Sequence, residues 1–176
     1  MRMRVLIAED ETIIRLDLRQ MLERHGLVVC AEARNGAEAV LLARDTEPDV
    51  AVLDLRMPEL DGIETARRIY AERPIPIVML TAFADRRNVE SAIEAGVFSY
   101  LVKPFRESDV VAAIRAAVAR HGELIEARRT LGAKPPPLGA VVVAVPSARG
   151  GSWPVRIERR EDGSIDVRGA DAETLP

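Results

Sequence analysis

Residues 49–54 read Asp-Val-Ala-Val-Leu-Asp, and this stretch decides the fold of the chain around it. Four apolar residues stand between two acidic ones, and Pro48 and Pro58 bound the segment. A short apolar run between turn-forming residues is typical of a strand buried on both faces. Asp54 would then lie where this strand leaves the core. Taken alone, Asp54 would be interpreted as the cap of a turn, so its role depends on which groups other segments bring to it.

Strand-like and helix-like segments alternate five times along the chain. Paired segments of this kind, each about 20–25 residues long, are typical of a parallel sheet with helices on both faces. We predict a flavodoxin-like, doubly wound, five-stranded parallel sheet in the order 2-1-3-4-5, with an extended fifth helix and a small C-terminal β-like tail. The expected strands are residues 4–8, 27–33, 50–54, 74–80 and 97–102, and the expected helices are 11–25, 37–46, 61–72, 85–95 and 108–129.

The composition is that of a soluble globular protein. The chain has 176 residues, of which 48% are hydrophobic and 30% charged, enough for one domain with a full core and some additional chain. No apolar run is long enough to span a bilayer, and the first residues do not resemble a signal peptide. Cys30 is the single cysteine, which excludes a disulfide within the chain. We therefore expect a cytoplasmic protein, and its net charge of −3 argues against chain-wide nucleic-acid binding.

Polar residues stand at the ends of four of the five predicted strands. In a parallel sheet of this order, the first and third strands are neighbours, and sites form beyond the C-terminal strand ends. We therefore predict that the polar groups converge on one crevice, which independent turn caps would not do. The residues are Glu9 and Asp10 after the first strand, Asp54 at the end of the third, Thr81 after the fourth and Lys103 after the fifth.

The chemistry of this cluster is that of phosphoryl transfer. Three carboxylates at close range repel one another, so a hard cation is expected to share the site. A set of oxygen ligands suits Mg²⁺, or Mn²⁺. Asp54 is the candidate nucleophile, because carboxylates can form aspartyl phosphates. Lys103 and Thr81 would stabilise charge on the transferred group, and Lys103 is one of only two lysines among 25 basic residues.

Four sequence blocks together resemble the receiver domain of two-component response regulators. They are Glu9-Asp10, the Asp54-Leu-Arg-Met-Pro-Glu-Leu-Asp-Gly62 run, Thr81-Ala82, and Tyr100-Leu-Val-Lys103-Pro104. The resemblance covers residues 3–122 and implies the CheY-like form of the fold. It also implies a response regulator of a phosphorelay signal transduction system. Such a protein is not an enzyme, apart from catalysing its own phosphoryl transfer and slow dephosphorylation.

The resemblance implies a role for each residue of the site. Asp54 would accept phosphate from a sensor histidine kinase or a small phosphodonor. A magnesium ion would be held by Glu9, Asp10 and Asp54 together with the backbone carbonyl of Arg56. The phosphate-binding and switch residues would be Thr81, Ala82, Tyr100 and Lys103, and the peptide bond before Pro104 would be cis. On phosphorylation, Thr81 would move toward the phosphate and Tyr100 would turn inward.

The signal has to act at a distance from the phosphate, which requires an element with two states. The candidate is the face formed by the fourth helix, the fifth strand and the fifth helix, through which a homodimer could also form. Phe83, two residues after Thr81, could shield the acyl phosphate from water. We therefore predict self-dephosphorylation with a half-life on the order of hours.

The rest of the chain differs in style from the receiver. We divide it into a helical extension at 123–132, a Pro-rich linker at 133–138 and a short tail at 139–176. Within the tail, residues 155–158 and 165–168 alternate around Glu161-Asp162-Gly163-Ser164, which predicts a β-hairpin. The helical extension could make a coiled contact or be a frayed end.

The output of the switch has two interpretations. Residues 7–17 and 80–83 most resemble receivers of ANTAR-type (AmiR/NasT) antiterminators, which carry a helical RNA-binding module after an extended fifth helix. Here the tail is Pro-rich and β-like, so RNA binding is uncertain. The chain is therefore either a single-receiver protein that acts through protein contacts, or an RNA-binding regulator with a missing or replaced output module. A phosphohydrolase is disfavoured, because Arg56 stands where a second acid would follow Asp54.

Overall fold

The computed structural model describes residues 2–82, 95–131, 140–146, 152–159 and 165–169 of the chain. The strands are β1 (Arg4–Ala8), β2 (Val28–Ala33), β3 (Val50–Asp54), β4 (Ile77–Thr81), β5 (Val97–Val102), β6 (Ala140–Pro146), β7 (Ser152–Arg159) and β8 (Ile165–Gly169). The helices are α1 (Thr12–Arg24), α2 (Gly36–Thr46), α3 (Gly62–Glu72) and α5 (Glu107–Leu131). The expected helix at 85–95 and the Pro-rich linker lie largely or wholly outside the described residues.

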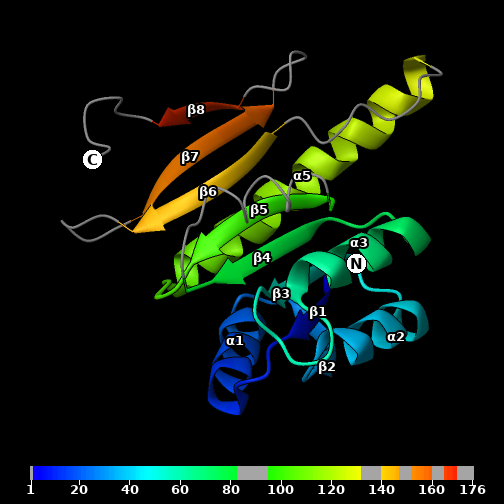
Figure 1. Cartoon of the computed structure of the whole chain (residues 1–176), viewed down its shortest axis with the longest axis vertical. Helices are drawn as coiled ribbons and strands as arrows, with labels where there is room; N and C mark the ends of the chain where they lie inside the picture. The colour runs from blue at the N-terminus through cyan, green and yellow to red at the C-terminus, as the bar shows by residue number, and fades with distance from the viewer. Residues whose placement is uncertain (1, 83–94, 132–139, 147–151, 160–164, 170–176) are drawn as a thin grey trace.

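The first five strands are parallel and lie in the predicted order, β2-β1-β3-β4-β5. Helices α1 and α5 pack on one face of this sheet, and α2 and α3 pack on the other (Figure 1). Each strand begins on the same side of the sheet, so all five C-terminal ends meet at one edge. This arrangement brings the polar residues at the strand ends together.

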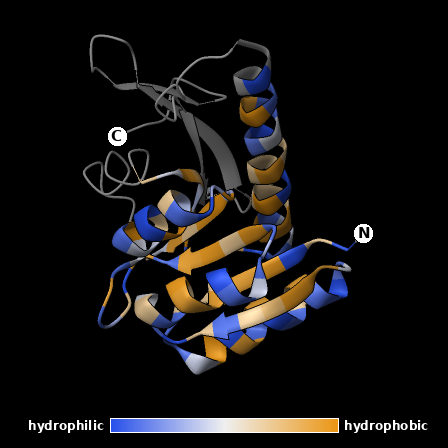
Figure 2. Cartoon of the chain, turned by 90° about the vertical axis from the view of Figure 1, so that its right-hand side faces the viewer, coloured by the Kyte–Doolittle hydropathy of each residue, from blue (hydrophilic) through white to orange (hydrophobic). Residues whose placement is uncertain are grey.

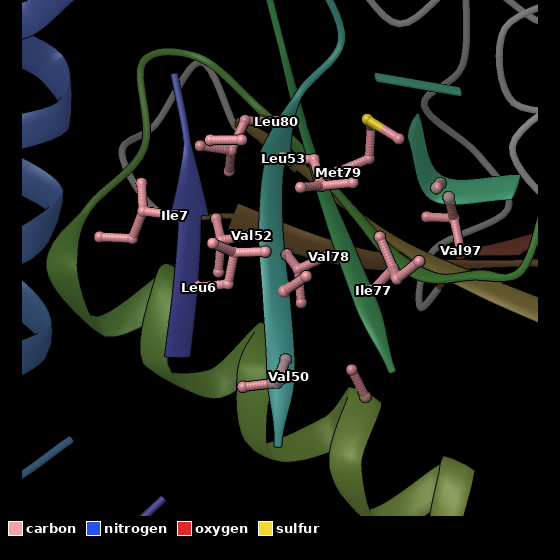
Figure 3. Close-up of a cluster of buried hydrophobic side chains, with 14 of the residues drawn as sticks. Leu6, Ile7, Val50, Val52, Leu53, Ile77, Val78, Met79, Leu80 and Val97 are labelled. Carbon is pink, nitrogen blue, oxygen red and sulfur yellow. The ribbon is translucent and has the colours of Figure 1, made fainter. Parts of the chain in front are cut away.

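The core explains why the central strands are apolar throughout. All five residues of β3 and all five of β4 are buried, because helices cover both faces of the sheet. Figure 3 shows side chains of β1, β3 and β4 packed together in this cluster. In Figure 2 the hydrophobic colour predominates on the central strands, whereas the helices carry hydrophobic and hydrophilic residues in alternation.

Local sequence signals place the helix starts. The Asn35 side chain accepts a hydrogen bond from the amide of Glu38 at 2.7 Å and so caps α2. Asp61 caps α3 in the same way, accepting from the amide of Glu64 at 2.8 Å. Such caps satisfy amides that have no partner within the helix. The largest boundary error is at β4, which begins at Ile77 and not at Pro74. Prolines at 74 and 76 cannot donate a hydrogen bond to a neighbouring strand.

The sequence led us to expect that the sheet ends at β5, but it continues beyond this strand. Strand β6 pairs with β5 in parallel, with Tyr100 opposite Val143. Strands β7 and β8 then continue the sheet in antiparallel fashion, so the described residues form one sheet of eight strands. The predicted pairing of 155–158 with 165–168 is present, with Ile157 opposite Val167. The tail therefore extends the receiver-like sheet (Figure 1). Within the described part of the chain, no helix is long and apolar enough to cross a membrane.

Candidate functional site

The acidic residues predicted from the sequence meet at the C-terminal edge of the sheet. Glu9 follows β1, and Asp54 is the last residue of the adjacent strand β3. One carboxylate oxygen from each of Glu9, Asp10 and Asp54 lies within 4.8 Å of the other two. Glu9 is fully buried and Asp54 is almost so, whereas Asp10 is exposed. The cluster is thus buried at its base and open to solvent at Asp10.

The Lys103 ammonium forms ion pairs with both buried carboxylates, those of Glu9 and Asp54. Its Nζ lies 2.8 Å from Glu9 Oε2 and 2.7 Å from Asp54 Oδ1. Its own position is held by the backbone, where the Lys103 amide donates to the Thr81 carbonyl at 2.6 Å. The peptide bond between Lys103 and Pro104 is cis. One ammonium group therefore bridges residues that are more than 40 positions apart in the sequence.

The charges of the site alter its proton affinities. Burial raises the pKa of Glu9, and the neighbouring Asp54 carboxylate adds to this; the hydrogen bond from Lys103 opposes it only in part. For Lys103, burial acts to lower the pKa, but the contacts with Asp54 and Glu9 outweigh it and the pKa is raised. Lys103 therefore stays protonated at neutral pH, while ionised Glu9 is held at an energetic cost.

The loop after β3 holds Asp54 in place. Asp54 Oδ2 accepts a hydrogen bond from the Arg56 amide at 2.9 Å. The Leu55 amide donates to the Leu80 carbonyl of β4 at 2.8 Å, and the Gly62 amide donates to the Leu55 carbonyl at 2.9 Å. A Cβ atom at Gly62 would collide with the Asp54 carbonyl oxygen. The first residue of α3 therefore packs directly behind the candidate nucleophile.

The remaining predicted residues lie in β4 and β5 or directly after β4. Thr81 ends β4 and is buried, and Ala82 after it is exposed. Tyr100 lies in the middle of β5, fully buried, opposite Met79 of β4. Phe83 lies outside the described residues. Thr81 and Lys103 therefore belong to the same edge as Asp54, whereas Tyr100 lies further back in its strand.

One residue of the site was not predicted. Arg15 of α1 is 7% exposed, and its Nη1 donates to the backbone carbonyl of Glu9 at 2.6 Å. A signal was available in the sequence: Arg15 stands in register with Leu18 and Leu22, at the spacing of a buried helix face. A charged residue at such a position indicates a specific partner, because unpaired burial of a charge is costly.

The donor set fits a small hard cation. Its three candidate ligands are all carboxylate oxygens, one of them exposed, as suits an ion that keeps several waters. A divalent cation here would also offset the cost of ionising buried Glu9. Thiol and imidazole ligands, which favour zinc or copper, are not part of this cluster.

Comparisons with known proteins agree with this geometry. The family model described as "Response regulator receiver domain" matches residues 5–115. The transcriptional regulatory protein PdtaR of Mycobacterium tuberculosis is 50% identical over 121 residues, which cover 69% of this chain and 59% of the relative. ResD of Bacillus subtilis is 40% identical over 120 residues, or 68% of this chain and 50% of that protein. The chain thus matches about half to three fifths of these relatives' lengths.

A solved structure shows the same fold. The signal receiver domain of a modulated diguanylate cyclase from Desulfovibrio desulfuricans aligns with a TM-score of 0.66 and 34% identity. The alignment covers 70% of this chain and 98% of that domain. The similarity therefore extends over a whole receiver domain and leaves part of this chain without a counterpart.

Proposed function

Because this chain belongs to the response regulator receiver family, we propose that Asp54 accepts a phosphoryl group from a sensor histidine kinase or from a small phosphodonor. The observation that carries the proposal is the contact of Lys103 with both Asp54 and Glu9, beside the exposed carboxylate of Asp10. The proposal places the protein in the cytoplasm, where its single cysteine stays reduced.

The two carboxylate oxygens of Asp54 have different partners. The Arg56 amide holds Oδ2, and the Lys103 ammonium lies against Oδ1. A carboxylate oxygen attacks phosphorus, the bond from phosphorus to the donor breaks, and the leaving imidazole or acyl oxygen keeps the electron pair. Lys103 then pairs with the phosphoryl oxygens, whose charge it can neutralise. The Thr81 hydroxyl, at the end of the adjacent strand, is the second candidate donor to the phosphate.

Glu9, Asp10 and Asp54, with the backbone carbonyl of Arg56, would hold Mg²⁺ (or Mn²⁺). When bound, this ion would neutralise charge on the phosphoryl group in transfer. In its absence, Lys103 is the group that balances Glu9 and Asp54. With Glu9 engaged as a cation ligand, the Lys103 ammonium would turn from Glu9 to the phosphoryl oxygens on Asp54.

The kinase would reach Asp54 across the first turns of α1. Ile13 is 83% exposed and Leu16 is 47% exposed, and both follow Asp10 closely in the chain. Exposed large apolar side chains beside a reactive group mark an interaction site. We therefore assign the α1 surface at Ile13 and Leu16 to contact with the phosphodonor protein.

Phosphorylation would act on the β5 side of the molecule through Thr81 and Tyr100. In this structure the outer edge of β5 is paired with β6, with Ser99 opposite Val142 and Leu101 opposite Ala144. A homodimer through the fourth helix, β5 and α5 therefore requires the tail to leave that edge. We propose that the tail controls access to this face, and that the output is made through protein contacts.

RNA binding is the second candidate function. It is favoured by the 50% identity to a transcriptional regulatory protein over the receiver region and by the extension of α5 to Leu131. Strands β6, β7 and β8 argue against a helical RNA-binding module at these positions. Binding of a hairpin RNA at moderate salt, measured with and without phosphorylation, would favour this candidate.

Mass spectrometry tests the central proposal. The wild type and Asp54→Asn would each be incubated with acetyl phosphate and Mg²⁺. We expect the wild type to gain the mass of one phosphoryl group and the variant to gain none. An unchanged mass in both proteins would overturn the proposal. A mass gain in both would show that a residue other than Asp54 is phosphorylated.

A further inference from the structure

Arg15 makes contacts that connect α1 to the acidic loop of the site. The side chain lies in the first turns of α1 and is almost fully buried. Nη1 donates to the Glu9 carbonyl at 2.6 Å, and the Asp10 carbonyl lies 3.5 Å away. Nη2 lies 3.4 Å from Thr12 Oγ1. The guanidinium thus turns back across the loop that joins β1 to α1.

These contacts complete the fixing of the Glu9 backbone. Its amide donates to the Ala33 carbonyl of β2 at 3.1 Å, and its carbonyl accepts from Arg15. Both backbone groups of Glu9 are therefore satisfied by different elements. Because β1 ends at Ala8, none of the described strands pairs with the next residue, Asp10. Among the described residues, Arg15 supplies the side-chain hydrogen bonds to the backbone carbonyls of Glu9 and Asp10.

A carboxylate on β2 holds the guanidinium from its other side. Arg15 Nε lies 3.7 Å from Glu32 Oε2. The same Glu32 side chain also receives Arg19 Nη1 at 2.8 Å. Arg19 does not contact Glu9 or Asp10 in the described bonds. Two arginines thus share one carboxylate, but only Arg15 also contacts the acidic pair.

We propose that Arg15 is a positioning residue that holds Glu9 and Asp10 in place for the divalent cation before the cation arrives. This inference rests on the proposed cation site. Its physical basis is preorganisation: an interaction outside the ligand shell orients the ligands, so less ordering is required when the ion binds. One nitrogen of Arg15, Nη1, contacts the carbonyls of two consecutive residues, Glu9 and Asp10, and so restricts the turn of the chain between them.

The sign of the effect distinguishes positioning from simple charge. The positive guanidinium lies beside the acidic cluster and repels a cation. If Arg15 acted only through its charge, its removal would make Mg²⁺ bind more tightly. If Arg15 positions the ligands, its removal makes Mg²⁺ bind more weakly. Loss of such an outer contact weakens metal binding by about 10–100-fold.

The experiment measures Mg²⁺ binding to the full chain by isothermal titration calorimetry, for the wild type and for Arg15→Met. We expect the variant to bind Mg²⁺ about tenfold more weakly. The second measurement is amide hydrogen exchange at Asp10 and Glu11 without Mg²⁺, where the variant should exchange faster. Equal or tighter Mg²⁺ binding by the variant, or unchanged exchange at these amides, would overturn the inference.

Arg19→Met is the matched control, because it removes a partner of the same Glu32 without touching Glu9 or Asp10. It should bind Mg²⁺ as the wild type does; weakened binding in this control would show that the effect runs through Glu32 and not through the Glu9 carbonyl. If Arg15→Met does not fold, Arg15→Gln replaces it under the same criteria. A wild type without Mg²⁺ affinity would refute the cation site itself, and the exchange measurement would still judge the positioning role.

Discussion

Replacement of Gly62 by alanine tests how closely the fold and the site depend on each other. Gly62 begins α3, and it needs no unusual backbone conformation. What it requires is the absence of a side chain. A Cβ here would meet the Asp54 carbonyl oxygen and would lie 2.9 Å from both Leu55 Cα and Met79 Sδ. Two of these three atoms belong to backbone in the buried sheet edge, so they cannot move aside at small cost.

The expected magnitude follows from this overlap. Forcing one extra carbon into a packed core costs about 1–3 kcal/mol. For a protein of this size, 1 kcal/mol corresponds to about 2–4 °C in melting temperature, so Gly62→Ala should lower it by roughly 2–12 °C. The displaced Asp54 backbone should also slow phosphorylation by acetyl phosphate, although no candidate ligand has been changed.

Gly122→Ala is the control. This glycine lies in α5, is exposed, and has no atom within 4 Å of an added Cβ. Alanine in an exposed helix is favoured over glycine by about 0.5–1 kcal/mol. The control should therefore raise the melting temperature slightly and leave phosphorylation unchanged.

Urea denaturation followed by circular dichroism gives the free energy of unfolding of the three proteins, and the slope against urea shows whether the unfolded states are comparable. A Gly62→Ala variant as stable as the wild type would refute the packing argument. A variant that is destabilised but phosphorylated at the wild-type rate would refute the link between α3 and Asp54.

Further predictions concern charge, lifetime and the tail. Burial raises the pKa of Glu9, so the protonated Glu9 side chain contributes stability below pH 4.5, and this contribution is lost as pH rises through the higher folded-state pKa. Glu9→Gln should therefore stabilise the Mg²⁺-free protein at neutral pH but not in acid. Thermal melts in which the variant shifts the melting temperature equally at neutral and acid pH would contradict this. Lys103→Met removes the cation that pairs with Glu9 and Asp54, and it should lower the free energy of unfolding by about 2–3 kcal/mol without Mg²⁺. The loss is less than for a fully buried pair, because Lys103 is partly exposed. A melting temperature of the variant that does not recover on adding Mg²⁺ would count against a shared cation. The phosphate on Asp54 should persist for hours, and a half-life of seconds, followed by mass spectrometry, would exclude shielding by Phe83. Val143→Pro interrupts β6, which is paired on both sides, and should allow phosphorylation-dependent dimerisation; light scattering that shows a monomer in every state would argue against control by the tail.

The receiver fold could be predicted because its signals are local. Strands such as β3 are covered on both faces, so they appear in the sequence as unbroken apolar runs. Helix starts are marked by Asn35 and Asp61, whose side chains cap the helix within three residues. The polar residues at the strand ends could be grouped because a parallel sheet places all of those ends at one edge.

Other features required the tertiary structure. The sequence suggested Arg15 as a buried charge only in retrospect, because its partner is a backbone carbonyl, which every residue possesses and no pattern reveals. The contact of Lys103 with Glu9 joins residues 94 positions apart, and only the folded chain shows which carboxylates the ammonium reaches.

The tail shows most clearly how far strand pairing can be predicted from sequence. By itself the sequence determined that 155–158 and 165–168 form a hairpin, because alternation and a turn act over a few residues. Only the tertiary structure decided that β6 continues the sheet at β5. Strand pairing is made by backbone groups that are the same in every residue, so sequence alone does not choose the edge. A five-stranded sheet offers two unpaired edges, β2 and β5, and only the folded chain shows that β6 pairs with β5.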